Sequence, residues 1–215
     1  MKLVKKKYTL NEESLNSISH GIGAIVSIIG FIILLKQCNK FDKDYLFFCT
    51  IIYGLSLITL YTSSAIYHSV INTKYKHIFR IIDHCCIFIL IAGTYTPILL
   101  ISIGGKTGWI FFITQWIIAF IGIILKVFYT GRYEILSVLI YILMGWMIMF
   151  KLNELITSIP DTAFRLLLFG GIIYTTGIIF YLIDNRIKYS HFIWHLFVML
   201  GSLIHYKMIL QYVVK

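Results

Sequence analysis

Charged side chains are scarce in this sequence. They make up 13% of its 215 residues, whereas ~25% is usual in a soluble domain. Apolar residues make up 59%, and several apolar runs reach the roughly 20 residues with which a helix crosses a bilayer. Runs such as 113–125 do not alternate apolar and polar residues, as the strands of a membrane barrel would. The sequence therefore predicts membrane-spanning helices in place of a soluble core.

Proline and paired cysteines are also nearly absent. None of the four cysteines forms a C-x-x-C pair, so no disulfide framework is indicated and we interpret them as small apolar packing residues. No glycine-rich loop follows a strand, which leaves nucleotide binding without support. One of the two prolines, Pro97, falls inside an apolar segment. There it is expected to kink the helix or to free a backbone carbonyl.

Basic residues outnumber acidic ones and give a net charge of +10. They are spread through short segments between the apolar runs, as topogenic charge is, and form no basic surface interleaved with aromatic residues. We therefore expect no nucleic-acid partner.

Seven apolar segments predict an all-α membrane protein of seven transmembrane helices. The chain forms a single domain, 1–215, whose first 18 residues are a polar cytoplasmic segment. The first apolar segment starts late and lacks a small-x-small cleavage site, so we interpret it as a retained span. The expected spans are 19–36, 45–67, 81–103, 107–126, 134–151, 163–183 and 190–212.

Lysine and arginine in the short loops predict the orientation. A cytoplasmic N-terminus places eleven of them on the cytoplasmic side and eight outside. Four of the eleven, Lys2, Lys5, Lys6 and Lys7, precede the first span. Seven spans then place the C-terminus outside.

Ionisable residues gather at one predicted membrane depth. His68 ends the second span, Asp83 and His84 begin the third, and His191 and His195 begin the seventh. Because successive spans alternate in direction, all five lie within one or two helical turns of the cytoplasmic face. Ionisable residues inside a span are costly and are therefore functional candidates.

The spacing of these residues favours a metal site. His191 and His195 are four residues apart, so both rings share one helix face, and His68 supplies a third imidazole. Three imidazoles with one open position are typical of a catalytic zinc, whose water has a pKa near ~7. Asp83 is placed to hold that water or take its proton, and Ser64, one turn before His68, to bind the water or a substrate oxygen.

Other interpretations remain open. Each histidine could bond a backbone carbonyl of a neighbouring helix, His68 could face lipid headgroups, and Asp83 could favour the dipole at its helix N-terminus. A bis-histidine haem would need facing pairs from two helices, and only one helix carries two suitable histidines. Imidazole also suits other metals, so iron or manganese are alternatives to zinc.

Glu12, Asn16 and His20 share one face of a helix that enters the first span. They predict either a polar interfacial helix with capping contacts or residues that surround the metal ligands, with His20 as a less favoured fourth ligand.

The other histidines are not expected to bind this metal. His77 lies in a basic loop, and His84 points about 100° away from Asp83 on its helix. His205 lies roughly 15 Å beyond His195.

At these residues the sequence resembles the hemolysin III family, which belongs with the progestin and adipoQ receptors, including the adiponectin receptors. The resemblance covers nearly the whole chain in order. It is carried by Glu12-x3-Asn16-x3-His20, Ser64-x3-His68, Asp83-His84-x2-Ile87-Phe88, the run from Ala92 to Pro97, Gly145-Trp146, His191-x3-His195 and His205.

The resemblance implies seven helices with a cytoplasmic N-terminus, in a bacterial plasma membrane. It implies zinc held by His68, His191 and His195, with Asp83 bonded to the zinc water and Ser64 beside it. Members of the wider superfamily are, or are proposed to be, hydrolases of lipid amides, and the founding bacterial member carries a cytolysin label. The long cytoplasmic extension of the receptors is missing, so adiponectin is not an expected partner.

Three functions follow as hypotheses. The first is a zinc-dependent intramembrane hydrolase of a lipid amide such as a ceramide-like N-acyl sphingoid base. The second is a pore or channel with a structural zinc, and the third a lipid sensor that binds lipid without cleaving it. The sequence does not distinguish these functions from one another, and it does not determine the oligomeric state.

Overall fold

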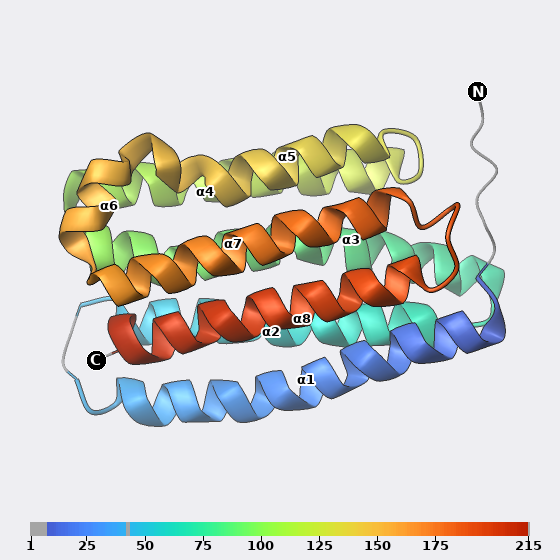
Figure 1. The fold of residues 1–215 in the computed structure, drawn as a ribbon, viewed down its shortest axis with the longest axis horizontal. Coiled ribbons are helices and arrows are strands. Elements are labelled where there is room, and N and C mark those ends of the chain that lie inside the picture. The colour runs from blue at the N-terminus through green and yellow to red at the C-terminus, as the bar shows by residue number, and fades with distance from the viewer. Residues whose placement is uncertain (1–7, 42–43, 215) are drawn as a thin grey trace.

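The structure, a computed structural model, describes residues 8–41 and 44–214, and these form a bundle of long helices (Figure 1). Seven of its helical segments are long and apolar enough to cross a membrane, which confirms the predicted fold class. They are Leu10–Cys38, Leu46–Ser69, Lys74–Ile103, Gly105–Tyr129, Glu134–Ser158, Asp161–Leu182 and Ser190–Val213.

Some of these segments contain more than one helix type. The elements are α1 (Leu10–Cys38), α2 (Leu46–Ser69), α3 (Thr73–Pro97), η1 (Ile98–Ile103), α4 (Gly105–Tyr129), α5 (Glu134–Trp146), η2 (Met147–Lys151), α6 (Leu152–Ser158), α7 (Asp161–Leu182), α8 (Ser190–Met208) and η3 (Ile209–Val213). Within the described residues no strand is present.

The first helix begins nine residues earlier than the predicted span. The Thr9 side chain accepts a hydrogen bond from the Glu12 backbone N–H, and the Glu12 carboxylate accepts one from the Thr9 N–H. This capping box satisfies two otherwise unpaired donors and fixes the helix start. Residues 10–18 of the polar N-terminal segment therefore form the first turns of α1, as the helix expected to enter the first span.

Pro97 changes the helix type. It ends α3, and the chain continues as the π-helix η1 to Ile103. Because proline has no backbone N–H, the regular α-helical bond is lost at this point. The third span nevertheless stays continuous.

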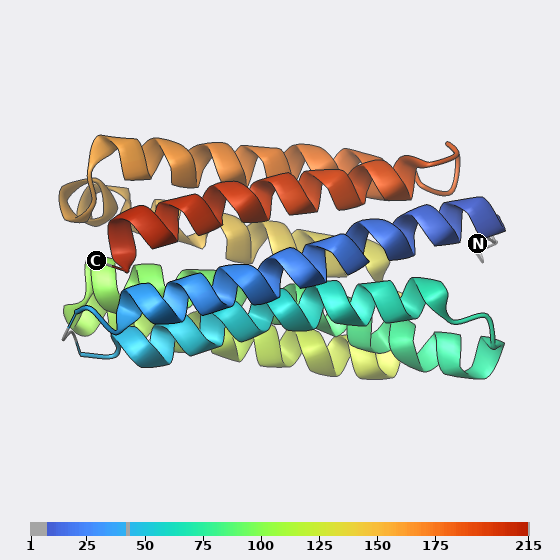
Figure 2. The ribbon, with the colours of Figure 1, turned by 90° about the horizontal axis from the view of Figure 1, so that it is seen from below.

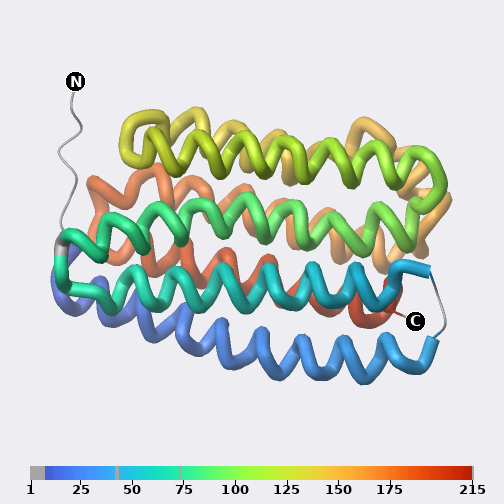
Figure 3. The backbone as a smooth tube through the Cα atoms, turned by 180° about the vertical axis from the view of Figure 1, so that it is seen from behind, coloured from blue at the N-terminus to red at the C-terminus, as the bar shows by residue number. Residues whose placement is uncertain are grey.

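The helices form two sides of the bundle. Figures 2 and 3 show α1 to α4 side by side, with α5, α7 and α8 on the other side. Helix α1 crosses the bundle obliquely and contacts both α2 and α8 (Figure 2). It begins at the same end of the bundle as α8 (Figure 1), and we call this end the histidine end. The basic residues Lys2, Lys5, Lys6, Lys7, Lys43 and Lys215 lie outside the described residues, and the orientation in the membrane stays a prediction.

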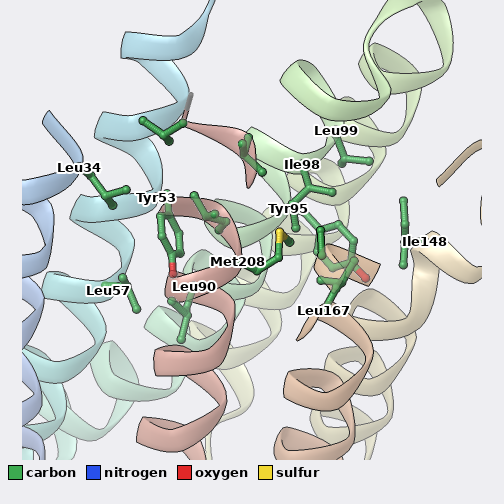
Figure 4. Close-up of a cluster of buried hydrophobic side chains, with 14 of the residues drawn as sticks. Leu34, Tyr53, Leu57, Leu90, Tyr95, Ile98, Leu99, Ile148, Leu167 and Met208 are labelled. Atoms are coloured by element: carbon green, nitrogen blue, oxygen red, sulfur yellow. The ribbon is translucent and has the colours of Figure 1, made fainter. Parts of the chain in front are cut away.

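Toward the opposite end, the interior is filled by apolar side chains (Figure 4). Because lipid tails are as apolar as these residues, close packing holds the helices together in a membrane. Gly108 of α4 illustrates this, since a Cβ atom built there would lie 2.2 Å from the backbone oxygen of Leu99 in η1. The labelled core residues are Leu34, Tyr53, Leu57, Leu90, Tyr95, Ile98, Leu99, Ile148, Leu167 and Met208.

Gly108→Ala should therefore destabilise the bundle. The added methyl group must push α4 away from a backbone atom, which we expect to lower the free energy of unfolding by about 1–3 kcal/mol. Thermal unfolding in detergent measures this change. Gly21→Ala in α1 is the control, since no atom lies within 4 Å of its added Cβ. Equal losses in both variants would contradict the packing argument.

Candidate metal centre and its cavity

Three histidines converge at the histidine end. His68 comes from the last turn of α2, and His191 and His195 come from the first two turns of α8. Each offers a ring nitrogen, and these nitrogens all lie within 4.8 Å of one another. All three side chains are buried. The structure thus brings together the three residues that spacing and topology selected.

Each of these rings is held through its Nδ1 atom. The distances are 2.7 Å from His68 Nδ1 to a Glu13 carboxylate oxygen and 3.2 Å from His191 Nδ1 to an Asp184 carboxylate oxygen. The third ring, that of His195, lies 3.2 Å from the Ser19 hydroxyl. Metal-binding histidines are usually oriented in this way, with the other nitrogen turned to the metal.

The second ring nitrogen of His68 also supports a metal site. Its Nε2 atom is buried and has no hydrogen-bond partner among the described residues. A buried polar atom without a partner is unfavourable unless a ligand satisfies it. The donor set, the Nδ1 contacts and the unpaired Nε2 together fit a zinc ion or another metal that prefers imidazole.

Sequence reasoning missed Glu13, Ser19 and Asp184. The first two lie on α1 beside the face that had been selected, and Asp184 precedes α8 by six residues. For Glu13 and Asp184 the charge offered a signal, because the chain has only nine acidic residues.

The predicted Glu12, Asn16 and His20 have different surroundings. The second carboxylate oxygen of Glu12 accepts the backbone N–H of Tyr189, at 3.1 Å. Glu12 thereby ties the start of α1 to the residue before α8.

His20 stacks on the ring of His195, with ring centroids 3.5 Å apart and an interplanar angle of 10°. Its nitrogens are not in the group within 4.8 Å, so the arrangement does not favour it as a fourth ligand. Asn16 and His20 are buried, and their side-chain polar atoms lack hydrogen-bond partners within the described part of the chain.

Asp83 and Ser64 line the same cavity as His191 and His195. Both are buried, and their roles at the site stay predictions. The Asp83 carboxylate lies 3.5 Å from Nδ1 of His84, and that nitrogen also lies 2.8 Å from the backbone oxygen of Arg80. His84 therefore contacts Asp83, although its helical position pointed away.

The cavity runs from the histidines into the bundle. It contains about 1340 Å³ of space between atoms, counting the space at its open side, and most of its lining is apolar. Among the lining residues, Gly145 and Met149 of the fifth span are exposed. Next to them the Trp146 indole donates to the Thr175 hydroxyl of α7, at 3.0 Å. At Gly145 and Met149 the cavity lining therefore reaches the side of the fifth span that lipid would surround.

Tyr8 covers the metal centre from the opposite direction. Its hydroxyl donates to Asp184 at 2.5 Å, and its ring centroid lies 5.2 Å from that of His191. Burial, followed by the Asp184 carboxylate, raises the pKa of the Tyr8 hydroxyl above its usual value, so this group stays protonated and donates. The sequence had given no sign of this contact.

Comparison with known proteins agrees with this architecture. The family model described as "Haemolysin-III related" matches residues 8–206. Hemolysin-3 of Bacillus cereus is 41% identical over 212 residues, which cover 99% of this chain and 96% of that protein. A Hemolysin-3 homolog of Bacillus subtilis is 39% identical and covers 97% of both chains.

A more distant similarity extends to an animal protein. The human monocyte to macrophage differentiation factor is 29% identical over 221 residues, which cover 97% of this chain and 87% of that protein. With the family model matching most of the chain and seven apolar helices crossing the bundle, the protein belongs to the hemolysin III family of multi-pass integral membrane proteins.

Proposed function

We propose that this protein is a zinc-dependent hydrolase of a lipid amide, acting within a bacterial plasma membrane. The observation that carries the proposal is that His191 and His195 line one end of a mostly apolar cavity, with His68 close enough to share a metal ion with them. The substrate class is an N-acyl lipid such as a ceramide-like N-acyl sphingoid base, whose amide reaches the histidines while its acyl chain occupies the cavity.

Different residues of the chain orient the metal ligands, transfer the proton and bind the substrate. Glu13, Asp184 and Ser19 orient the three imidazoles. These three histidines would hold a zinc ion, which would supply polarisation of an acyl carbonyl and a water of lowered pKa. Asp83 moves a proton to the leaving amine, and the Ser64 hydroxyl bonds a substrate oxygen.

Lipid enters from the side. Tyr8 packs against the rings of His68 and His191 at the histidine end, whereas the cavity lining reaches the lipid-facing side at the exposed Gly145 and Met149. An acyl chain can thus move from the bilayer into the cavity without crossing water.

A pore-forming function is the second candidate. It is favoured by the similarity to the protein named Hemolysin-3, and the histidines would then hold a structural metal. Ion pathways are usually lined by rings of charged side chains or by backbone carbonyls. The lining of the described cavity is instead mostly apolar, with its charged groups at the histidine end.

The metal content of the purified protein tests the foundation of the proposal. Wild type should carry about one zinc ion per chain, His68→Ala should lose it, and Glu13→Gln should bind it about 10–100-fold more weakly. Elemental analysis and competition with a chelator of known affinity measure these values. The controls are His77→Ala, at an exposed histidine, and Glu154→Gln, whose ion pair with Lys151 lies in the η2–α6 region. A metal-free wild type would remove the basis of the enzyme hypothesis.

Turnover on long-chain amides tests the reaction. Asp83→Asn should retain its metal and cleave at least ~100-fold more slowly than wild type, because it cannot transfer the proton. Liquid chromatography with mass detection of the released acid follows the reaction. Asp161→Asn, at the exposed start of α7, should match wild type. A metal-loaded wild type that cleaves no amide in the panel would contradict hydrolysis and leave lipid binding alone.

Dye release from liposomes separates the two candidate functions. The hydrolase proposal expects wild type and a His191→Ala, His195→Ala double variant to leave the vesicles equally tight. Leakage that wild type causes and the double variant retains would favour the pore.

A further inference from the structure

A second polar group lies in the same cavity, far from the metal centre. The inner face of α8 continues from His195 through Val198 and Ser202 to His205, and all four are buried. Ten residues separate His195 from His205, which corresponds to about 15 Å along the helix. His205 and Tyr174 of α7 both line the cavity at this level, with ring centroids 5.5 Å apart.

His205 has an unused acceptor. Its Nε2 atom lies 3.0 Å from the backbone oxygen of Leu167. Since a carbonyl only accepts, Nε2 carries the hydrogen, and Nδ1 of the neutral ring is then an acceptor. That Nδ1 atom is buried and has no hydrogen-bond partner in the part of the chain described.

Tyr174 and Ser202 supply a donor beside it. Tyr61 donates to the Ser202 hydroxyl at 2.7 Å, and Ser202 and Tyr174 share a hydrogen bond of 2.6 Å. This second bond uses one of the two hydroxyl hydrogens of the Ser202–Tyr174 pair. When Ser202 donates to Tyr174, the Tyr174 hydroxyl keeps its own hydrogen for a ligand, because each hydroxyl donates once. Tyr174 is the member of the pair that lines the cavity.

Two glycines seat these rings. A Cβ atom on Gly170 of α7 would lie 2.3 Å from the ring of His205, and one on Gly201 of α8 would lie 2.8 Å from the ring of Tyr174. Each ring thus packs against the glycine of the facing helix. This reciprocal packing fixes both polar groups at one level of an otherwise apolar wall.

We propose that the cavity recognises a lipid whose acyl chain carries a hydroxyl group about 15 Å from the group held at the histidines. This hydroxyl donates to Nδ1 of His205 and accepts from the Tyr174–Ser202 pair. A hydroxyl is suited to the position because it donates and accepts at the same oxygen. The inference rests on the proposed function, which places the amide of the lipid at the metal centre.

Binding of matched fatty acids tests the inference without any turnover. The probes are 12-hydroxyoctadecanoic acid, whose hydroxyl lies roughly a dozen bonds and ~15 Å from the carboxyl group, together with 2-hydroxyoctadecanoic acid and octadecanoic acid. Displacement of a fluorescent fatty acid from detergent-purified, metal-loaded protein gives their affinities. Wild type should bind the 12-hydroxy acid about 3–10-fold more tightly than octadecanoic acid, as one added hydrogen bond allows. The 2-hydroxy acid should show no such gain.

Two variants assign the preference to the proposed residues. His205→Gln keeps a donor for Leu167 and removes the Nδ1 acceptor, and Tyr174→Phe keeps the ring against Gly201 and removes the hydroxyl. Both should bring the ratio of the two affinities close to one and leave octadecanoic acid binding within about twofold. Tyr95→Phe is the matched control, since the Tyr95 hydroxyl also lies in the cavity wall but already donates to the Gly145 carbonyl, at 2.5 Å. It should keep the wild-type ratio.

The inference fails if wild type does not distinguish the 12-hydroxy acid, or if both variants retain its preference. Thermal unfolding of each variant separates a lost contact from a lost fold. Failure of the hydrolase proposal would look different, because binding preference is measured without cleavage. A protein that cleaves amides but ignores the hydroxyl contradicts this inference alone, and one that prefers the hydroxyl but cleaves nothing contradicts only the hydrolase.

Discussion

A histidine ring buried in a membrane bundle needs a partner for each nitrogen, because the bilayer core offers no water to bond. In this protein the hydrogen bonds to Nδ1 of His68, His191 and His195 meet that requirement on one side of each ring. Two of the three come from α1, so the first helix joins the end of α2 to the start of α8. The oblique path of α1 across the bundle allows it to reach both (Figure 2). The bond from Tyr189 to Glu12 adds a backbone contact at the same place, and the geometry of the metal centre depends on these contacts.

The interior of the bundle differs between its two ends in how it is filled. Toward the end opposite the histidines, apolar side chains and close helix contacts fill the space (Figure 4). Beside this core runs the cavity, with ionisable groups at one level and the His205–Tyr174 pair at another. A ligand that satisfies both levels has to be long, apolar in its middle and polar at defined positions. Under the proposed function, the spacing of the polar groups would select such molecules, because the apolar wall between them fits many chains equally well.

Hydropathy and spacing predicted the seven spans and the convergence of His68, His191 and His195, because apolar length and alternating direction determine both. The early start of α1 was foreshadowed by the Thr9-x-x-Glu12 pattern of a capping box, but hydropathy alone placed the span too late. Periodicity shows which residues share a face of a helix, but not which neighbouring helix that face contacts. It therefore selected Glu12 and Asn16, whereas Glu13 and Ser19 make the contacts with the histidine rings. Asp184 and Tyr8 approach the site from segments outside the spans, where no periodicity operates. The cavity could not be predicted, since it is the space that packed side chains leave.

The hydrogen bond between Ser19 and His195 joins residues that are 176 positions apart. A ribosome that adds about 5–20 residues per second needs on the order of 10–30 s to make that stretch. During biosynthesis α1 therefore enters the membrane with Ser19 and His20 lacking their later neighbour His195 on α8. The site joins α1, the first helix to be synthesised, to α8, the last. In a chain interrupted before α8, the Glu13 carboxylate has only the imidazole of His68 beside it. The group formed by His68, His191 and His195 can therefore assemble only after α8 has been synthesised.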